Sequence, residues 1–377
     1  MSTFTFPVGY HDLHKTKIID FQLNRWYSLG YSRLKDMEEA AANIKDLSDW
    51  KEEMVRLADK ALSEGRLING TFYYRAAEFF THPKDPDKKA LYDKFTDLFY
   101  NQLFANEPIE RYKVPYGNAY LPALTVPMQG ASKLGTIVIH GGFDSFIEEF
   151  YSIALYFSDL GYEIIMFDGP GQGGALKEYG LPIDYAWEKP AKAILDYFKV
   201  DNVIWLGISM GGWLCFRAAA YEPRIKRVIA LSIAYDYMKI PPKAVEKFAR
   251  WLFKYPMVMN MLSKLKMKLM PQEKWGIDNL MYITKTDTPL DAALAFIKFN
   301  EENLKSGLVT QDVLILTGAE DHFIPLKLHH MQVAALNRAK SITERIFLKE
   351  DHAQNHCQIG NIGLALEVMA KWISQIP

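Results

Sequence analysis

Gly207-Ile208-Ser209-Met210-Gly211 is the most informative segment of this sequence. It follows an apolar run at 203–206 and precedes a run at 212–220 that has the composition of a helix. A serine flanked by glycines at this spacing is typical of a sharp turn from a strand into a helix, because glycine lets other backbone pass closely. The alternative interpretation is an ordinary strand-to-helix turn with a capping serine.

Ser209 at the apex of such a turn exposes its hydroxyl above the edge of a sheet, where a nucleophile can meet its substrate. The N–H of Met210, next to the start of the following helix, then faces any oxyanion that forms there. The stretch therefore predicts Ser209 as a nucleophile and Met210 as one of two backbone donors to an oxyanion.

Composition indicates a large globular protein and restricts its partners. Of the 377 residues, 49% are hydrophobic and 24% are charged, and a formal net charge of −1 gives no reason to expect nucleic acid or a membrane as a partner. The two cysteines, Cys215 and Cys357, fit a reducing compartment, so we expect a cytoplasmic protein. Residues 1–15 lack the pattern of a signal peptide, and no apolar run reaches transmembrane length.

The sequence contains no cysteine and histidine cluster at zinc spacing and no Walker pattern, so we expect neither a metal nor a cofactor. Asp168-Gly169-Pro170-Gly171-Gln172-Gly173-Gly174 is rich in glycine. Pro170 and the missing G-x-G-x-x-G spacing argue against a dinucleotide site there. We interpret this segment as a structural turn near the site.

The first hundred residues are predicted to be helical, and they form the N-terminal helical domain, 1–108. Apolar spacing predicts one helix over 36–64, an aromatic-dense segment covers 71–81, and a second helix follows over 87–106. A β-hairpin is predicted over 112–126, with its turn at Tyr116-Gly117-Asn118, and it ends the helical part of the sequence.

Strands and helices alternate after the hairpin. The predicted strands are 136–139, 162–167, 203–206, 228–233, 313–316 and 345–348, and the predicted helices are 146–160, 185–199 and 362–373. Continuous Val/Ile strands separated by helices predict an α/β protein whose mainly parallel sheet is covered by helices on both faces. The sheet-bearing core is expected in two parts, 109–238 and 304–377.

The segment 239–303 is far longer than a simple crossover needs and is predicted to be a helical insertion. It is rich in methionine, at Met257, Met259, Met261, Met267, Met270 and Met281. One interpretation is a lid in which flexible methionines adapt to a ligand. The other is the ordinary packing of a helical subdomain.

A serine nucleophile needs a base, and the base needs an orienting acid; on such a sheet the chain order is serine, acid, histidine. Asp321 follows the strand at 313–316 and is the predicted acid, with Glu320 and then Asp236 as alternatives. His356 follows the last strand and is the predicted base. His352 competes with it, and His322 is a weaker candidate.

His140-Gly141-Gly142-Phe143 follows a buried strand and is the expected source of the second oxyanion donor. The N–H of Gly142 and that of Phe143 are equally suitable. His329 and His330 lie in a predicted helix and are interpreted as structural.

These motifs resemble those of the α/β-hydrolase superfamily. More narrowly, they resemble a branch that contains FrsA-like esterases, 2,6-dihydroxypseudooxynicotine hydrolases and fungal polyketide-shortening hydrolases, whose members are often labelled dipeptidyl aminopeptidase or acylaminoacyl peptidase. The resemblance is carried by six segments: 140–145 with Glu148-Glu149, 168–173, 207–212, Asp321, 356–358 and the N-terminal 73–80.

The resemblance implies an α/β-hydrolase fold whose N-terminal helical domain packs over the site, and a Ser–His–Asp hydrolase of an ester, of an amide or of the C–C bond of a 1,3-diketone. A β-propeller has no counterpart in the first hundred residues, which argues against the peptidase label. An ester of a small, partly apolar compound is the preferred substrate. A binding protein that retains the fold without activity is the alternative of another class, and a homodimer is the candidate assembly.

Overall fold

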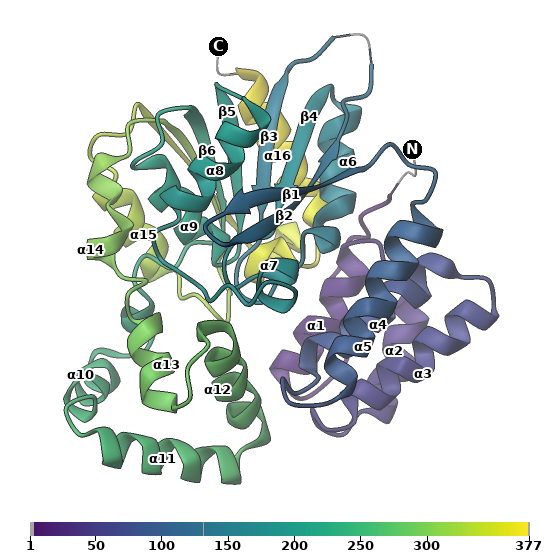
Figure 1. The fold of residues 1–377 in the computed structure, drawn as a ribbon, viewed down its shortest axis with the longest axis vertical. Helices are drawn as coiled ribbons and strands as arrows, with labels where there is room; N and C mark the ends of the chain where they lie inside the picture. The colour runs from purple at the N-terminus through teal and green to yellow at the C-terminus, as the bar shows by residue number, and fades with distance from the viewer. Residues whose placement is uncertain (1–3, 131, 376–377) are drawn as a thin grey trace.

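The strands form one eight-stranded sheet with the order β1-β2-β4-β3-β5-β6-β7-β8 (Figure 1). The structure, a computed structural model, describes residues 4–130 and 132–375, so Met1–Thr3 of the segment judged for a signal peptide lie outside it. The strands are β1 (Glu110–Tyr116), β2 (Ala119–Val126), β3 (Gly135–His140), β4 (Tyr162–Phe167), β5 (Val203–Ile208), β6 (Ile225–Leu231), β7 (Asp312–Gly318) and β8 (Ser341–Phe347).

The pairing matches the expectation of a mainly parallel sheet. β1 and β2 form the predicted hairpin, and β2 pairs with β4 in the antiparallel sense. All other neighbours, from β4 through β8, pair in parallel. Each of the six strands predicted after the hairpin is present within a few residues of its predicted bounds. Five of them are the continuous apolar runs typical of strands buried on both faces, whereas β8 is the largely exposed strand at the edge of the sheet.

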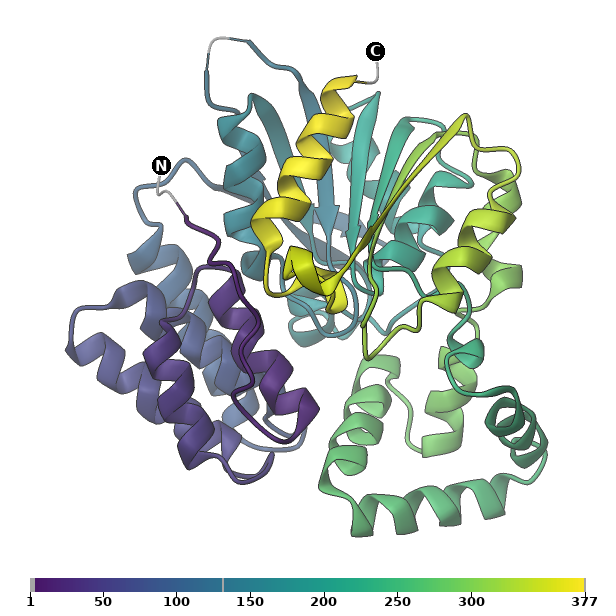
Figure 2. The ribbon, with the colours of Figure 1, turned by 180° about the vertical axis from the view of Figure 1, so that it is seen from behind.

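Helices cover both faces of the sheet. Figure 1 shows α8 and α9 in front of it, and Figure 2, seen from behind, shows α6 and α16 on the opposite face. The helices that belong to the sheet-bearing core are α6 (Tyr151–Asp159), α7 (Gly173–Lys177), α8 (Glu188–Phe198), α9 (Gly211–Ala219), α15 (Lys327–Ala335) and α16 (Ile362–Gln375). The predicted fold class is confirmed.

Two helical regions flank the carboxyl edge of the sheet, and both views show them on the same side of it (Figures 1 and 2). The N-terminal region contains α1 (Lys17–Ser28), α2 (Leu34–Asn43), α3 (Trp50–Ser63), α4 (Leu67–Phe80), α5 (Asp87–Asp97) and a π-helical turn (Leu98–Leu103). The helical insertion, which we call the lid as a name only, contains α10 (Lys243–Leu252), α11 (Pro256–Leu269), α12 (Pro271–Thr284), α13 (Pro289–Phe296) and α14 (Glu301–Leu304). Within the described residues, no helix is both long enough and apolar enough to cross a bilayer.

The single helix predicted over 36–64 is wrong, because α2 and α3 are separate helices. Between them, the Asp46 carboxylate accepts the N–H and the hydroxyl of Ser48, and Asp49 accepts the N–H of Lys45. Such local side-chain bonds compete with helical hydrogen bonding. The break also lets Trp50 turn inward, where its indole N–H donates to the Ala76 carbonyl at 2.6 Å.

The N-terminal helices and the sheet share one hydrophobic core. Trp26, Phe72 and Phe99 from the helical region belong to the same buried cluster as Ile139 of β3 and Trp372 of α16. A second cluster fills the opposite face of the sheet, under α8 and α9. The helical region is therefore held against the sheet and its covering helices by shared apolar burial.

A buried cluster of charged side chains crosses the same boundary, and we call it the ion cluster: Arg25, Arg75, Glu78, Lys88, Glu149 and Lys177. Arg75 of α4 is fully buried. Its guanidinium donates to Glu149 at 2.5 Å, to the Asp144 carbonyl at 2.8 Å and to Glu78. Glu149 and Asp144 precede α6, so these bonds tie the helical region to the core.

Glu78, also of α4, is the carboxylate of the ion cluster that contacts Arg75, Lys88 and Lys177. Its carboxylate lies 2.5 Å from Lys177 of α7 and 2.9 Å from Lys88 of α5. Burial alone raises the pKa of Glu78, but Lys177, Lys88 and Arg75 outweigh burial and hold this pKa below its ordinary value of 4.5.

We expect Glu78→Gln to lower the free energy of unfolding by about 3–5 kcal/mol, because it leaves buried cations without their counter-charge. Since the pKa of Glu78 is depressed in the folded state, this stabilisation is present above pH 4.5 and is lost as the pH falls through the folded value. Urea unfolding at neutral pH measures it.

Glu39→Gln is the matched control. Glu39 also contacts two cations, Arg56 and Lys60, but its side chain is 30% exposed. Its loss should cost less than about 1 kcal/mol. Equal losses at Glu78 and Glu39 would contradict a structural role for burial in the ion cluster.

Candidate active site

Ser209 stands between the end of β5 and the start of α9, in a strained turn. Its φ of 61° lies in the left-handed region, which non-glycine residues rarely adopt. Glycine is required on both sides: a Cβ on Gly207 would lie 2.0 Å from the Gly211 carbonyl oxygen, and a Cβ on Gly212 would lie 2.0 Å from that of Ser232. The N–H of Ser209 donates to the Leu231 carbonyl of β6 at 2.8 Å. The local sterics thus fix a serine at the carboxyl edge of the sheet.

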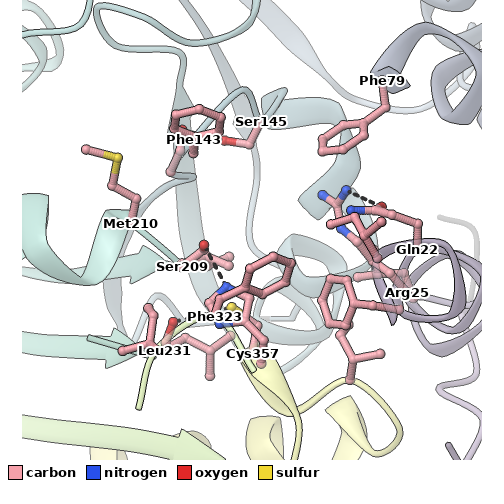
Figure 3. Close-up of a pocket in the computed structure, with 18 of the residues that line it drawn as sticks. Gln22, Arg25, Phe79, Phe143, Ser145, Ser209, Met210, Leu231, Phe323 and Cys357 are labelled. Carbon is pink, nitrogen blue, oxygen red and sulfur yellow. Dashed lines mark hydrogen bonds between the residues drawn. The ribbon is translucent and has the colours of Figure 1, made fainter. Parts of the chain in front are cut away.

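Ser209, His356 and Asp321 lie in one line of hydrogen bonds. The Ser209 Oγ is 2.8 Å from the His356 Nε2, and the His356 Nδ1 is 2.6 Å from the Asp321 Oδ2. Figure 3 draws the bond from Ser209 as a dashed line. When the Nδ1–H donates to the carboxylate, Nε2 is left with a lone pair that can accept the serine proton. Residues separated by 147 positions along the chain are therefore in contact.

Asp321 is held in place by backbone as well as by histidine. Its Oδ1 accepts the N–H groups of Phe323 and Ile324, each at 2.9 Å. Burial alone raises the pKa of Asp321, but His356 and these two N–H groups lower it below 3.8. Both carboxylate oxygens are thus engaged, and the side chain is ionised at neutral pH.

The pKa of His356 reflects the same contact. Burial lowers this pKa, but the negative charge of Asp321 overrides burial and raises it above the ordinary value of 6.5. A histidine in this position is a stronger base than a free imidazole, and it readily takes a proton from a hydroxyl at hydrogen-bond distance.

The alternative acids and bases named from the sequence lie elsewhere. Glu320 is exposed, and the Asp236 carboxylate accepts the N–H of Met238 at 2.8 Å. His352 is exposed on the loop before His356. His322 is the neighbour of Asp321 in the sequence, but its ring packs against Phe21 and Phe323. Desolvation lowers the pKa of His322 to about 4. None of the four is hydrogen-bonded to Ser209, His356 or Asp321 in the described part of the chain.

The loop after β3 lies directly against the turn that carries Ser209. A Cβ on Gly142 would lie 2.5 Å from the backbone nitrogen of Met210, so these two backbone segments touch. The Gln172 side-chain amide donates to the carbonyls of Gly141 and Gly142, at 2.8 and 3.1 Å. Because both carbonyls are bound by Gln172, the loop is held in one orientation beside Met210.

A cavity of roughly 330 Å³ opens onto Ser209 and His356. Its wall is mostly apolar and includes Phe21 of α1, Phe79 of α4 and Trp275 of α12, so both helical regions contribute. Figure 3 shows Arg25 and Gln22 across the cavity from Ser209. Apart from His356, Arg25 is the one charged side chain that lines it among the described residues.

Comparison with known proteins identifies the family. Residues 136–355 match the model of a family described as alpha/beta hydrolase fold. The chain belongs to this family. Of its relatives, hydrolase LUC6 of Fusarium sp is 28% identical, with 89% of this chain and 90% of LUC6 aligned. Alpha/beta hydrolase psoB of Aspergillus fumigatus is 27% identical over 83% and 81% of the two chains.

The fold is also similar to that of a solved hydrolase. The crystal structure of the 2,6-dihydroxy-pseudo-oxynicotine hydrolase superposes with a TM-score of 0.66. The two chains are 20% identical, and the superposition covers 93% of this one and 94% of the other. The hydrolase fold therefore extends over the N-terminal helical region as well as over the core.

Arg25 and Trp275 line the cavity although no local signal in the sequence marks them, because each reaches it only through the packing of its helix. The glycine-rich segment 168–174 is a turn near the site, as interpreted from the sequence, and its Gln172 fixes the loop beside Met210. None of the six methionines of the insertion lines the cavity, and the role of the insertion as a lid stays a prediction.

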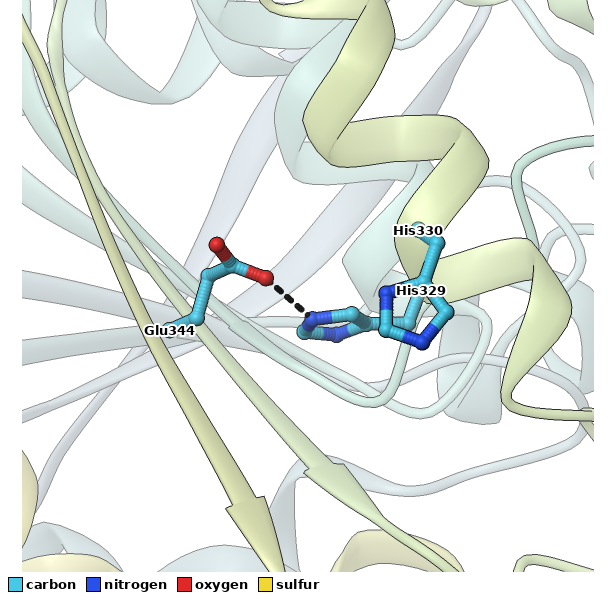
Figure 4. A group of neighbouring side chains, drawn as sticks. All are labelled: His329, His330 and Glu344. Atoms are coloured by element: carbon cyan, nitrogen blue, oxygen red, sulfur yellow. Dashed lines mark hydrogen bonds and ion pairs between the residues drawn. The ribbon is translucent and has the colours of Figure 1, made fainter.

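A group of potential metal ligands lies away from the cavity (Figure 4). His329, His330 and Glu344 each offer a ligand atom, and these atoms all lie within 4.8 Å of one another. Both ring nitrogens of His329 are already engaged, one with Thr317 at 2.8 Å and the other with Glu344 at 2.7 Å. These hydrogen bonds account for the buried ring of His329, in line with its structural interpretation, whereas His330 is exposed.

We expect Gly207→Ala to destabilise the hydrolase by about 1–3 kcal/mol, because its Cβ would overlap the Gly211 carbonyl at 2.0 Å. Gly276→Ala, within α12, is the control: a Cβ there meets nothing within 4 Å. Since alanine favours a helix over glycine, this variant should be more stable by about 0.5–1 kcal/mol. Thermal unfolding of the two variants and the wild type measures both changes, and equal effects would contradict the steric argument.

Proposed function

We propose that this protein is a serine hydrolase that cleaves an ester of a small, partly apolar carbonyl compound. The observation that carries the proposal is the line of two hydrogen bonds from Ser209 through His356 to Asp321. A hydroxyl, a base whose pKa is raised and a buried carboxylate in this order are what nucleophilic attack on a carbonyl requires.

The proposed reaction uses Ser209 as nucleophile. Its Oγ attacks the carbonyl carbon while the His356 Nε2 takes the proton, and Asp321 stabilises the imidazolium that forms. His356 then gives this proton to the leaving oxygen, and a water molecule repeats the sequence to release the acid. The proposed steps require only these side chains, backbone donors and water.

The oxyanion of the tetrahedral intermediate is proposed to bind backbone N–H groups. Met210 supplies one donor, and Gly142 or Phe143 supplies the other. The contact between Gly142 and the Met210 nitrogen supports this assignment, because it brings the two donor segments to one side of Ser209. Each donor in such a hole is worth about a hundredfold to a thousandfold in rate.

The cavity wall supports a substrate with an apolar body and an oxygen acceptor at one end. Phe21, Phe79 and Trp275 offer aromatic surface. Across from Ser209, Arg25 binds Glu149 and Gln22 through two of its five N–H groups, and its side chain remains 13% exposed. The remaining donors suit a carbonyl or carboxylate oxygen of the substrate.

We expect Ser209→Ala to lower the rate of p-nitrophenyl ester hydrolysis at least about a thousandfold, because the nucleophile is removed. A fluorophosphonate probe should label the wild type at Ser209 and leave the variant unlabelled. His352→Gln is the control and should keep nearly full activity, whereas His356→Gln should not.

Retained ester turnover in Ser209→Ala would refute the proposed nucleophile, and absent labelling of the wild type would favour a binding protein on a hydrolase fold. Loss of a β-diketone chromophore and release of p-nitroaniline from aminoacyl anilides, measured beside the ester, separate C–C and amide hydrolysis from ester hydrolysis.

The pH profile tests the roles of His356 and Asp321. Because Asp321 raises the pKa of His356 above 6.5, the base is free only as the pH rises through this raised value. The acidic limb of kcat/KM should therefore lie above pH 6.5. Asp321→Asn removes the raising charge, so the limb should move to lower pH while kcat falls by about ten-thousandfold. An unmoved limb would show that Asp321 does not set the pKa of the base.

A further inference from the structure

Helices α10 and α11 of the lid expose many large apolar side chains, of which we call six the lid face: Phe248, Trp251, Tyr255, Met261, Leu265 and Leu269. On α11, Met261, Leu265 and Leu269 recur at four-residue spacing and so share one side of the helix. Their exposed fractions are 62%, 52% and 70%. Ser263 and the half-buried Met267 lie on the other side, toward the rest of the lid.

The aromatic part of the lid face lies on α10 and in the turn that follows. Phe248 and Trp251 stack with ring centroids 5.8 Å apart, and Trp251 and Tyr255 are 4.9 Å apart. Figures 1 and 2 both show α11 along the edge of the molecule farthest from the sheet. The lid face is therefore accessible to an extended flat surface.

Positive charge surrounds the lid face. Residues 243–274 contain eight Lys and Arg side chains and two Glu, a net charge of +6 in a chain whose total is −1. Lys264 and Lys268 flank the apolar row of α11, and within residues 4–130 and 132–375 neither pairs with an acidic side chain. The expectation of no membrane partner was based on the total charge, which conceals this segment.

We propose that the lid face binds the surface of an anionic lipid bilayer, with its apolar row in the interface and its lysines against the lipid headgroups. Exposed aromatic and aliphatic side chains flanked by lysine are the pattern of helices that lie in a membrane interface. A symmetric dimer through the same face is disfavoured, because it would bring two segments of net charge +6 together.

The lid face lies next to the helix that lines the cavity, so binding to a bilayer would place the cavity near the membrane surface. α12 follows α11 directly, and its Trp275 lines the cavity at Ser209. A bilayer under α10 and α11 would therefore hold the mostly apolar cavity close to a reservoir of apolar compounds. This inference does not depend on the chemistry of Ser209.

Co-sedimentation of the full chain with lipid vesicles tests the proposal. Vesicles of phosphatidylcholine with about a quarter phosphatidylglycerol should bind the protein, and phosphatidylcholine alone should bind it far more weakly. Trp251 is the reporter, because it is the most exposed of the eight tryptophans, at 50%. Its fluorescence should shift to shorter wavelength on binding, and Trp251→Phe should abolish the shift.

Two double variants separate the apolar and the charged contributions. Met261→Glu with Leu265→Glu should abolish vesicle binding, and Lys264→Gln with Lys268→Gln should weaken it roughly fivefold for each lysine. Leu134→Glu is the matched control, because Leu134 is an equally exposed apolar residue, at 65%, outside the lid. It should bind as the wild type does.

Equal binding to neutral and anionic vesicles, or no binding to either, would overturn the proposal. Light scattering measures the other contrary outcome, which is a dimer. If the wild type is a dimer that does not bind vesicles, and if Met261→Glu with Leu265→Glu dissociates this dimer, the lid face binds a second copy of the chain. The thermal unfolding midpoint of each variant, compared with that of the wild type, shows that its fold is intact and depends on neither the vesicles nor the reactivity of Ser209.

Discussion

The bonds of the buried ion cluster position the N-terminal helices on the core, and the wall of the cavity follows from that position. Apolar packing alone would hold the N-terminal helices against the sheet but would fix their position poorly, because the hydrophobic effect is not directional. The bonds of Arg75 to Glu149 and to the Asp144 carbonyl have defined geometry. They set where α4 lies relative to α6, and α1 is carried into place through Arg25 and Glu149.

The cavity follows from this placement. Phe21 and Arg25 of α1 and Phe79 of α4 form one side of it, and the hydrolase core supplies Ser209 and His356 on the other. The ion cluster and the cavity wall thus share a residue, Arg25, whose guanidinium binds Glu149 and Gln22 and which also lines the cavity. Through this residue the contact between the helical region and the core is physically linked to the wall of the cavity.

Much of the fold could be read from the sequence, and the failures have local causes. Most strands could be predicted because runs such as Ile137–Ile139 are apolar at every position, as a strand buried on both faces requires. The helix predicted over 36–64 failed because Asp46 and Asp49 bind nearby backbone and interrupt it. Whether the methionines of the insertion face the cavity could not be read from the sequence, because composition does not give the direction in which a helix turns its side chains.

The turn at Ser209 is encoded locally, since a Cβ on Gly207 would collide with Gly211 inside the same turn. The order in which serine, acid and histidine follow their strands is likewise a property of the sequence. Only the tertiary structure decided which of these side chains meet. His352 and His356 are four residues apart, yet one is exposed and the other bonds both Ser209 and Asp321. Gln172, Arg25 and Trp275 likewise acquire their neighbours only on folding, because contacts between distant residues depend on how whole elements pack.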